Sequence, residues 1–151
     1  MQKKPYIIAF LFFLIDLVSK QIISHVIRLE QSVKVIHNFF YLTYVKNSGA
    51  AWSILKDQRM LLLIVSVLVL FMINQYLKKE KIKKNEYFVY GMIIGGIIGN
   101  LFDRIIYGSV IDFLDFKIFG YDYPIFNLAD TFIVIGMILL IIINIKKETN
   151  Y

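Results

Sequence analysis

The chain has 151 residues, of which 58% are hydrophobic and 19% are charged. This is too much apolar surface for one soluble core of this size, which excludes an ordinary soluble domain and predicts a membrane protein. The formal net charge of +6 comes from short basic clusters between apolar runs, so we expect no nucleic-acid partner. The sequence contains no cysteine, which excludes a thiol nucleophile, a thiolate metal site and a disulfide.

Four apolar runs, each close to the ~20 residues that a membrane helix needs, divide the chain. They predict an all-α membrane protein with four transmembrane helices, folded as one membrane-embedded domain over residues 1–151. The first run has the basic start of a signal peptide, but Asp16 and Lys20 interrupt it and no small-x-small cleavage site follows. We therefore expect it to be a retained span. The runs are residues 6–27, 60–77, 87–106 and 123–145.

Short lysine clusters predict how the chain is oriented in the membrane. The positive-inside rule assigns the places where they lie to the cytoplasm. Both termini are therefore expected in the cytoplasm, and residues 28–59 and 107–122 on the outer side. The clusters are Lys3 and Lys4 before the first run, Lys78, Lys79, Lys81, Lys83 and Lys84 between the second and third, and Lys146 and Lys147 after the fourth.

The outer segment of residues 30–56 is expected to form short strands rather than a helix. Its central part, residues 33–45 (VKVIHNFFYLTYV), is rich in the β-branched and aromatic side chains that favour strands. The turn-prone residues Asn47, Ser48 and Gly49 follow directly. We therefore expect this segment to form a small β structure on the outer side of the membrane.

The third run carries glycines at helical spacing. Gly91, Gly95 and Gly99 recur every four residues, with Gly96 beside them. A helix face made of such small residues lets another helix approach closely. We therefore expect this face to serve packing rather than chemistry.

The charged residues of the spans converge on one depth. With a rise of ~1.5 Å per helical residue, Asp103 lies about 24 Å from the inner end of the third run. By the same rise, Asp16 and Lys20 lie about 15 and 21 Å along the first run. A fourth span that starts outside near Pro124 places Asp130 about 9 Å down. Because a charge on a membrane helix costs on the order of 3 kcal/mol, one site in the outer half explains these residues better than scattered accidents.

Asp112 and Asp130 are the candidate catalytic pair. Asp112 lies just beyond the end of the third run, and Asp130 near the head of the fourth. Two neighbouring carboxylates cannot easily both ionise, so they share a proton: the ionised one activates water, and the protonated one hydrogen-bonds the substrate carbonyl. This is aspartic-protease chemistry, and it needs no metal or other cofactor. The structural alternative is that Asp112 is a loop acid and Asp130 a helix cap or ion-pair partner.

Asn127 is a candidate for holding one of these acids. It precedes Asp130 by three residues, so a helix that begins near Pro124 presents both on one face. The amide then positions the Asp130 carboxylate. The alternative is that Asn127 is an N-terminal helix cap.

A second polar cluster ends the third run, where Asn100 is followed by Asp103 and Arg104. An Asp beside an Arg is typical of a structural ion pair, and Arg104 is interpreted as a clamp of the bundle that also meets lipid headgroups. Asp16 and Lys20, four residues apart, face the same way and neutralise one another. For this pair a structural role and a substrate contact remain open.

Other protease chemistries fit the sequence less well. There is no H-E-x-x-H motif, and His25 and His37 alone do not make a zinc site, which argues against a metalloprotease. Lys20 and Ser24 have the spacing of a Ser/Lys dyad on a helix, but nothing else supports it.

Short motifs extend over nearly the whole chain. They are Asp16-Leu17-Val18-Ser19-Lys20; Asn47-Ser48-Gly49-Ala50-Ala51-Trp52-Ser53; Gly95-Gly96 followed by Gly99-Asn100-Leu101-Phe102-Asp103-Arg104; Gly108-Ser109-Val110-Ile111-Asp112-Phe113; and Phe126-Asn127-Leu128-Ala129-Asp130. Each motif alone is weak, but all of them in this order, within four spans and at this length, are very specific. In this combination the chain resembles the lipoprotein signal peptidase family, also called signal peptidase II.

The resemblance implies a four-helix intramembrane aspartic protease with a small extracytoplasmic β cradle. It implies removal of the signal peptide from a prolipoprotein by cleavage just before a cysteine that already carries diacylglycerol. The enzyme would lie in the bacterial cytoplasmic membrane with its active site toward the outer face. Expected partners are diacylglyceryl-prolipoprotein substrates, membrane lipids and globomycin-type inhibitors. A monomer is expected, since a single bundle supplies every residue named.

The resemblance also assigns residues. Asp112 and Asp130 match the catalytic aspartates. Trp52 and nearby aromatic residues are expected to close over a signal peptide that enters laterally and lies against residues 33–45. The other strongly patterned positions of the family, which stabilise the site or contact substrate and inhibitor, are matched by Asp16, Lys20, Asn47, Gly49, Asn100, Asp103, Arg104, Asn127 and Ala129.

Two other classes of protein fit parts of the pattern. In a small proton or ion transporter, the acids of the spans and Lys20 would line an ion path, but the polar residues concentrate toward one side and the inner half offers no relay. In a structural membrane protein, the polar groups would act as interhelical glue, which needs no acid at the outer surface.

Overall fold

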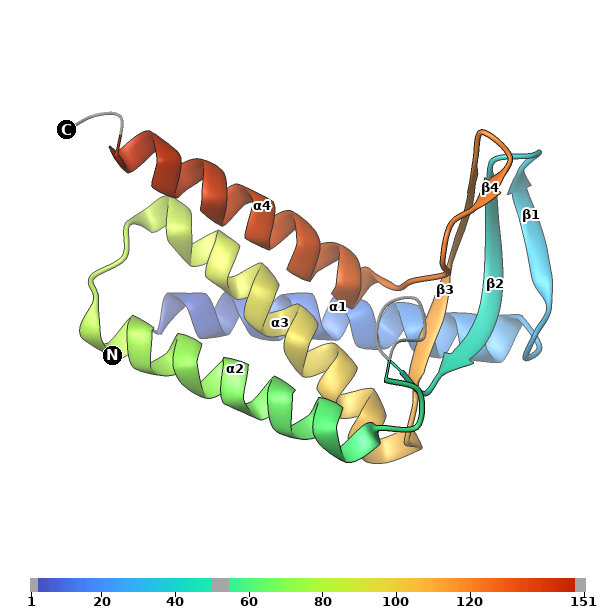
Figure 1. Cartoon of the computed structure of the whole chain (residues 1–151), viewed down its shortest axis with the longest axis horizontal. Helices are drawn as coiled ribbons and strands as arrows, with labels where there is room; N and C mark the ends of the chain where they lie inside the picture. The colour runs from blue at the N-terminus through green and yellow to red at the C-terminus, as the bar shows by residue number, and fades with distance from the viewer. Residues whose placement is uncertain (1–2, 50–54, 149–151) are drawn as a thin grey trace.

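The computed structural model describes residues 3–49 and 55–148 of the chain. The described part contains helices long and apolar enough to cross a membrane, together with a small antiparallel sheet, which confirms the predicted class of fold. In Figure 1 the helices form a bundle, the sheet stands at one end of it, and both termini lie toward the other end. The elements in chain order are α1 (Lys4–Val26), β1 (Ser32–Ile36), β2 (Phe40–Asn47), α2 (Arg59–Lys79), α3 (Lys84–Tyr107), β3 (Val110–Ile118), β4 (Tyr121–Asp122) and α4 (Leu128–Glu148).

Helix α3 is the centre of the bundle and contacts α1, α2 and α4. Its glycines explain how the neighbours come so close. A Cβ atom at Gly95 would overlap the backbone of α1, and one at Gly96 would overlap the carbonyl of Ala129 on α4. The predicted packing face is therefore confirmed, and it serves two partner helices rather than one.

The outward faces of the other helices carry large apolar side chains. Each of three examples is more than half exposed: Phe10 on α1, Met72 on α2 and Ile138 on α4. In water such continuous apolar faces would be unfavourable, whereas hydrocarbon covers them without cost. The bundle thus keeps its polar contacts near α3 and turns its apolar surface outward.

The sheet has the strand order β1-β2-β3-β4, with every pairing antiparallel. Strand β2 extends from the predicted strand region up to Asn47, which pairs with Val110 at the start of β3. In the same register Val45 pairs with Asp112. The alternative that Asp112 is a loop acid is therefore wrong: it lies on a central strand, two residues from the position opposite Asn47.

Helix α4 begins at Leu128, so the expectations of a span from residue 123 and of a helix start near Pro124 are wrong. The reason is a contact with the sheet. The Phe126 carbonyl accepts hydrogen bonds from the N–H groups of Phe113 and Leu114 at 2.9 and 2.8 Å, and the Phe126 N–H donates to the Leu114 carbonyl at 3.2 Å. This pairing holds the approach to α4 in an extended form beside β3 and brings Asp130 into the first turn of the helix.

Candidate active site

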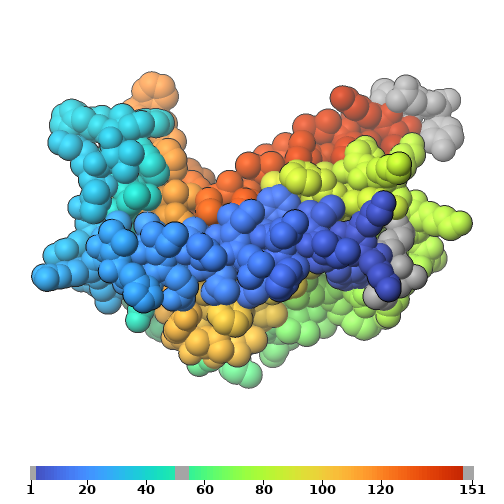
Figure 2. All heavy atoms as spheres, turned by 180° about the vertical axis from the view of Figure 1, so that it is seen from behind, coloured from blue at the N-terminus to red at the C-terminus, as the bar shows by residue number. Residues whose placement is uncertain are grey.

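A pocket of about 460 Å³ lies between β3, the segment before α4, and α4 itself. Its volume is in the range of small-molecule and peptide side-chain sites. Figure 2 shows the hollow from behind, between the sheet on the left and α4 on the right. Both candidate catalytic aspartates line it. The lining residues are Asn47, Asn100, Arg104, Val110, Asp112, Tyr123, Pro124, Ile125, Phe126, Asp130, Thr131, Ile133, Val134 and Ile135.

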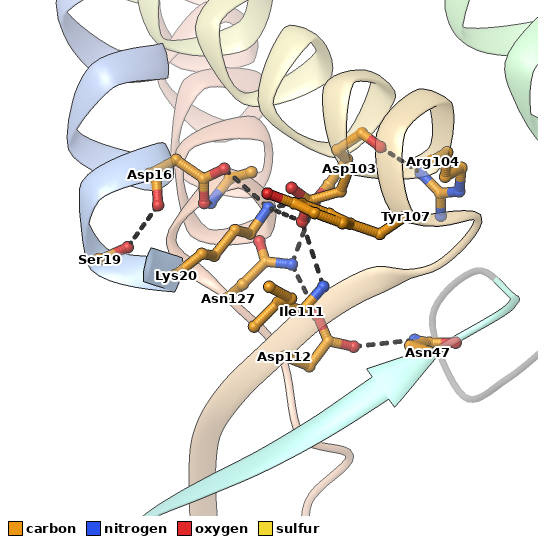
Figure 3. A network of polar contacts seen from close by, with 12 residues as sticks. Asp16, Ser19, Lys20, Asn47, Asp103, Arg104, Tyr107, Ile111, Asp112 and Asn127 are labelled. Atoms are coloured by element: carbon orange, nitrogen blue, oxygen red, sulfur yellow. Dashed lines mark hydrogen bonds and ion pairs between the residues drawn. The ribbon is translucent and has the colours of Figure 1, made fainter. Parts of the chain in front are cut away.

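Asp112 is buried, and two amide groups hold its carboxylate (Figure 3). Asn47 Nδ2 donates to Oδ2 at 2.9 Å, and Asn127 Nδ2 donates to Oδ1 at 2.6 Å. Burial, and then the negative charge of Asp130, raise the pKa of Asp112 to about 7, although both amide donors oppose the rise. An acid with this pKa changes its protonation state near neutral pH, which suits acid–base catalysis.

Asp130 approaches the same pocket from the first turn of α4. Asn100 Nδ2 donates to its Oδ1 at 2.7 Å, and the Asn127 backbone N–H approaches Oδ2 at 3.4 Å. In return the Asn127 Oδ1 accepts a hydrogen bond from the Asp130 N–H at 2.9 Å. The two residues thus form a reciprocal cap at a helix N-terminus, where the helix dipole favours a carboxylate.

Of the two alternatives for Asn127, the N-terminal cap is confirmed, and the expectation that its amide positions the Asp130 carboxylate is wrong. It is the N-terminal cap of α4, as its contacts with Asp130 show. Its side-chain amide also positions a carboxylate, but that carboxylate belongs to Asp112 and not to Asp130. The same amide nitrogen donates to Asn100 Oδ1 at 3.1 Å, so Asn127 joins the surroundings of the two acids.

A buried cluster of charges lies behind the pocket. Lys20 Nζ is 2.7 Å from Asp16 Oδ2 and 3.0 Å from Asp103 Oδ2, and it donates to Asn100 Oδ1 at 3.1 Å. The pairing of Asp16 with Lys20 is confirmed. The predicted pairing of Asp103 with Arg104 is wrong, since among the described residues the ion-pair partner of Asp103 is Lys20.

The two carboxylates of this cluster also accept backbone hydrogen bonds. Asp103 Oδ2 accepts from the Ile111 N–H at 3.1 Å, and Asp16 Oδ1 accepts from the Ala129 N–H at 2.9 Å. The fully buried Ala129 therefore enters the site through its backbone. Gly99 makes room for the cluster, because a Cβ atom there would overlap the Asp16 carboxylate.

Arg104 clamps the turn after β2 instead of pairing with Asp103. Its Nη2 donates to the Gly49 carbonyl at 2.8 Å, and the Gly49 N–H donates to Asn47 Oδ1 at 2.9 Å. This fixes Asn47 beside Asp112 and places the guanidinium on the pocket wall. The expected cover by Trp52 falls outside the described residues.

The predicted site residues all belong to this one network, either through side chains or, for Gly49 and Ala129, through the backbone. The Ser/Lys alternative is wrong, because the Lys20 ammonium is held by three acceptors and Ser24 donates to the Gln21 carbonyl at 3.0 Å. Within residues 3–49 and 55–148, no three His, Cys, Asp or Glu side chains are grouped so that they would hold a metal ion.

Sequence reasoning missed the walls of the pocket. Thr131 lines it and donates its hydroxyl to the Asn127 carbonyl at 2.9 Å. Val134 and Ile135 form its side toward the outer face of α4, and Ile133, which packs against α3, also lines it. Because Thr131 follows Asp130 directly in the sequence, its place near the site could have been predicted. Nothing in the sequence separates the isoleucines and valine of the pocket from those that face lipid.

The family model described as signal peptidase (SPase) II matches residues 8–146. The chain belongs to the signal peptidase II family. This family is a family of peptidases. Together with the membrane-spanning helices and the similar fold of a bacterial membrane enzyme, the family indicates a bacterial membrane protein. It also favours the enzyme over the transporter and the structural protein.

Relatives of this signal peptidase II family member are similar over almost their whole length. The lipoprotein signal peptidase of Staphylococcus haemolyticus is 38% identical, over 99% of this chain and 98% of the relative. The lipoprotein signal peptidase of Halothermothrix orenii is 39% identical, over 95% of this chain and 96% of the relative. A bacterial membrane enzyme solved by the in meso method at 2.3 Å resolution has a TM-score of 0.89 and 35% identity, over 97% of this chain and 90% of that chain.

Proposed function

We propose that this protein is an intramembrane aspartic endopeptidase with Asp112 and Asp130 as its catalytic pair. It removes the signal peptide from diacylglyceryl-modified prolipoproteins by cutting just before the lipidated cysteine. The observation that carries the proposal is that both carboxylates line one pocket, from a strand and from a helix, in a chain of a peptidase family. The similar proteins named lipoprotein signal peptidases support the class of substrate.

The reaction uses one proton shared by the two acids. At neutral pH the raised pKa of Asp112, about 7, favours a pair that holds one proton between them. The ionised carboxylate takes a proton from water, which attacks the scissile carbonyl carbon, while the protonated one hydrogen-bonds the carbonyl oxygen. Collapse of the tetrahedral intermediate breaks the C–N bond, and the proton taken from water goes to the leaving amine.

The amide donors around the acids prepare this geometry. Asn47 and Asn127 fix both oxygens of Asp112, and Asn100 fixes one oxygen of Asp130. Carboxylates held in this way need little reorganisation when the substrate arrives, which is a large part of catalysis by positioning.

The pocket opens toward the lipid side of α4. Val134 and Ile135 line it and are exposed on the outer face of the helix. A signal peptide that is itself a membrane segment reaches such a pocket sideways, with its acyl chains left in the bilayer. This supports a lipid-anchored substrate over a soluble peptide.

We place the sheet and the pocket at the outer membrane surface and both termini in the cytoplasm. The lysines of the α2–α3 connection and of the C-terminal end of α4 lie at the bundle end opposite the sheet (Figure 1). The positive-inside rule assigns that end to the cytoplasm. A lipidated cysteine at the outer interface then lies at the depth of the aspartates.

The test is a gel shift of a diacylglyceryl-modified prolipoprotein incubated with the purified protein in detergent. We expect cleavage just before the lipidated cysteine by the wild type, unchanged by a metal chelator. Asp112→Asn and Asp130→Asn each lose on the order of 10⁴-fold in turnover while remaining folded, because each removes one role in the proton transfer. Full activity in either variant would refute the catalytic pair.

A matched control is Asp122→Asn, which changes an exposed acid on β4 with a surface ion pair to Lys117. It keeps the turnover of the wild type. A folded wild-type protein that leaves the prolipoprotein intact would contradict the proposed function as a whole.

A further inference from the structure

Two backbone contacts, called clasps below, lie directly beside the candidate catalytic aspartates. Asp103 Oδ2 accepts a hydrogen bond from the N–H of the residue before Asp112, at 3.1 Å. Asp16 Oδ1 accepts one from the N–H of the residue before Asp130, at 2.9 Å. The clasps hold β3 and α4 at the positions next to the two acids, so they affect the spacing between them.

One ammonium group joins the two clasps (Figure 3). Lys20 Nζ lies 2.7 Å from Asp16 Oδ2 and 3.0 Å from Asp103 Oδ2, and all three side chains are almost completely buried. Because the clasping carboxylates come from α1 and α3, Lys20 fixes their relative position. A shift of Lys20 therefore changes both clasps at once.

The third donor of Lys20 sets the direction of a chain of amides. An ammonium group has donors only, so Asn100 turns its oxygen to Lys20 at 3.1 Å and its NH₂ to Asp130 at 2.7 Å. The same oxygen accepts from Asn127, whose NH₂ also donates to Asp112 at 2.6 Å. With this polarity each acid receives a donor; with the amides reversed, each would face an oxygen.

We propose that Lys20 is a positioning residue of the peptidase reaction, which sets both the spacing of Asp112 and Asp130 and the donors that each receives. This inference rests on the proposed function. Lys20 does not line the pocket, so it acts through the clasps and the amides and not by contact with the substrate.

A purely structural role makes a different demand on this position. Buried ion pairs are often replaced by neutral side chains of similar volume with little loss of stability, or with a gain. Positioning instead requires a side chain with three donors and no acceptor. No neutral side chain of this length provides that. Replacing Asp16 and Lys20 together leaves the net charge of the buried cluster unchanged, whereas Lys20→Met alone leaves both Asp16 and Asp103 without their cation. The double variant therefore separates the two roles.

The test compares Lys20→Met and the double variant Asp16→Asn/Lys20→Met with the wild type. The folded fraction, kcat, KM and the pH profile of prolipoprotein cleavage are measured in detergent. We expect the double variant to be folded and its kcat to fall on the order of 10²-fold, the loss expected for misplaced catalytic groups, with KM within about twofold. Lys20 lowers the pKa of Asp112, so the pH profile of both variants moves to higher pH.

Lys147→Met is the matched control. It removes the lysine of another ion pair with a buried carboxylate, that of Glu86, at 2.8 Å and at the opposite end of α3. This variant keeps the pH profile and the kcat of the wild type, whatever it does to stability.

The outcomes are distinct. A folded double variant with the kcat and pH profile of the wild type would overturn the positioning role, and so would failure of both Lys20 variants to fold. In either case the proposed function stands as long as the wild type cleaves and the Asp→Asn variants do not. If the wild type itself does not cleave, the proposed function fails first, and the inference fails with it.

Discussion

The two ends of the bundle bury carboxylates in different ways. At the end away from the sheet, Glu86 accepts the Lys83 N–H at 2.7 Å and pairs with Lys147 at 2.8 Å, so a helix cap and one lysine account for both oxygens. At the sheet end, four carboxylates share two cations. The first arrangement is balanced in charge, and the second has an excess of negative charge, which the proposed proton shared by Asp112 and Asp130 would relieve. The four carboxylates are Asp16, Asp103, Asp112 and Asp130, and the cations are Lys20 and Arg104.

This comparison separates a structural buried acid from one suited to chemistry. Burial alone does not distinguish them, because Glu86 and Asp112 are both almost fully buried. What differs is the link to a cavity and to a second carboxylate: Asp112 has both, and its proton exchanges near neutral pH. An unbalanced group of acids at a pocket is therefore the stronger indicator of catalysis.

The largest effect in this comparison is expected from Gly99→Ala. The added methyl group would overlap the Asp16 carboxylate, whose Oδ1 accepts the Ala129 N–H, and so would displace one clasp beside Asp130. We expect turnover to fall on the order of 10²-fold. Cleavage assays on the folded variant check this.

Gly136→Ala is the corresponding change on the face of α4 that packs against Val89 and Ile93 of α3, away from both aspartates. Its methyl group would overlap Cγ1 of Ile93 on α3, so the Ile93 side chain has to shift. Overpacking of this kind costs about 1–3 kcal/mol of stability and leaves the chemistry alone. Equal losses of turnover in Gly99→Ala and Gly136→Ala would show that packing near the aspartates matters no more for the reaction than packing elsewhere between α3 and α4.

Stability should depend on pH through Asp112. Its pKa is raised from 3.8 to about 7 by folding, so the folded state binds its proton more tightly than the unfolded chain does. The stabilisation is present below pH ~4 and is lost as the pH rises through about 7; it amounts to at most about 4 kcal/mol. We expect the thermal unfolding temperature of the wild type to fall over this range, and that of Asp112→Asn to fall less. Parallel curves for the two proteins would show that another group is responsible.

The smallest effect is expected at the other end, from Lys147→Met. Glu86 loses one partner and keeps its cap, and Lys147 is partly exposed, so the cost in unfolding free energy is about 1–2 kcal/mol. Denaturation measured in the same detergent checks this value. A loss of turnover without a loss of stability would connect this end of the bundle to the reaction.

The sequence predicts the spans well because length and hydropathy determine them. The first three predicted runs agree with α1, α2 and α3 to within three residues at each end. The start of α4 could not be predicted in this way, because it depends on the pairing of Phe126 with β3, and a strand partner far away in sequence leaves no local pattern.

The site could be predicted only in part. Spacing on one helix correctly paired Asp16 with Lys20, because residues four apart share a face. Asp103 and Arg104 are adjacent, so on a helix they point in different directions, and the partner of Asp103 came from α1 instead. Strand β3 was not predicted, because Asp112 and Asp115 interrupt its apolar pattern. In the structure Asp115 serves the sheet, since it accepts a hydrogen bond from the Thr43 hydroxyl of β2 at 2.5 Å.

The two acids are mounted on different kinds of element, Asp112 on a strand and Asp130 on a helix. The donors of Asp112 come from β2 and from the residue before α4, so its surroundings exist only once the sheet has docked on the bundle. If Asp112 acts as proposed, a chain whose helices have inserted but whose sheet has not yet formed is expected to be inactive. During refolding, we expect cleavage activity to appear after the helical signal, which makes activity a reporter of the last step of assembly.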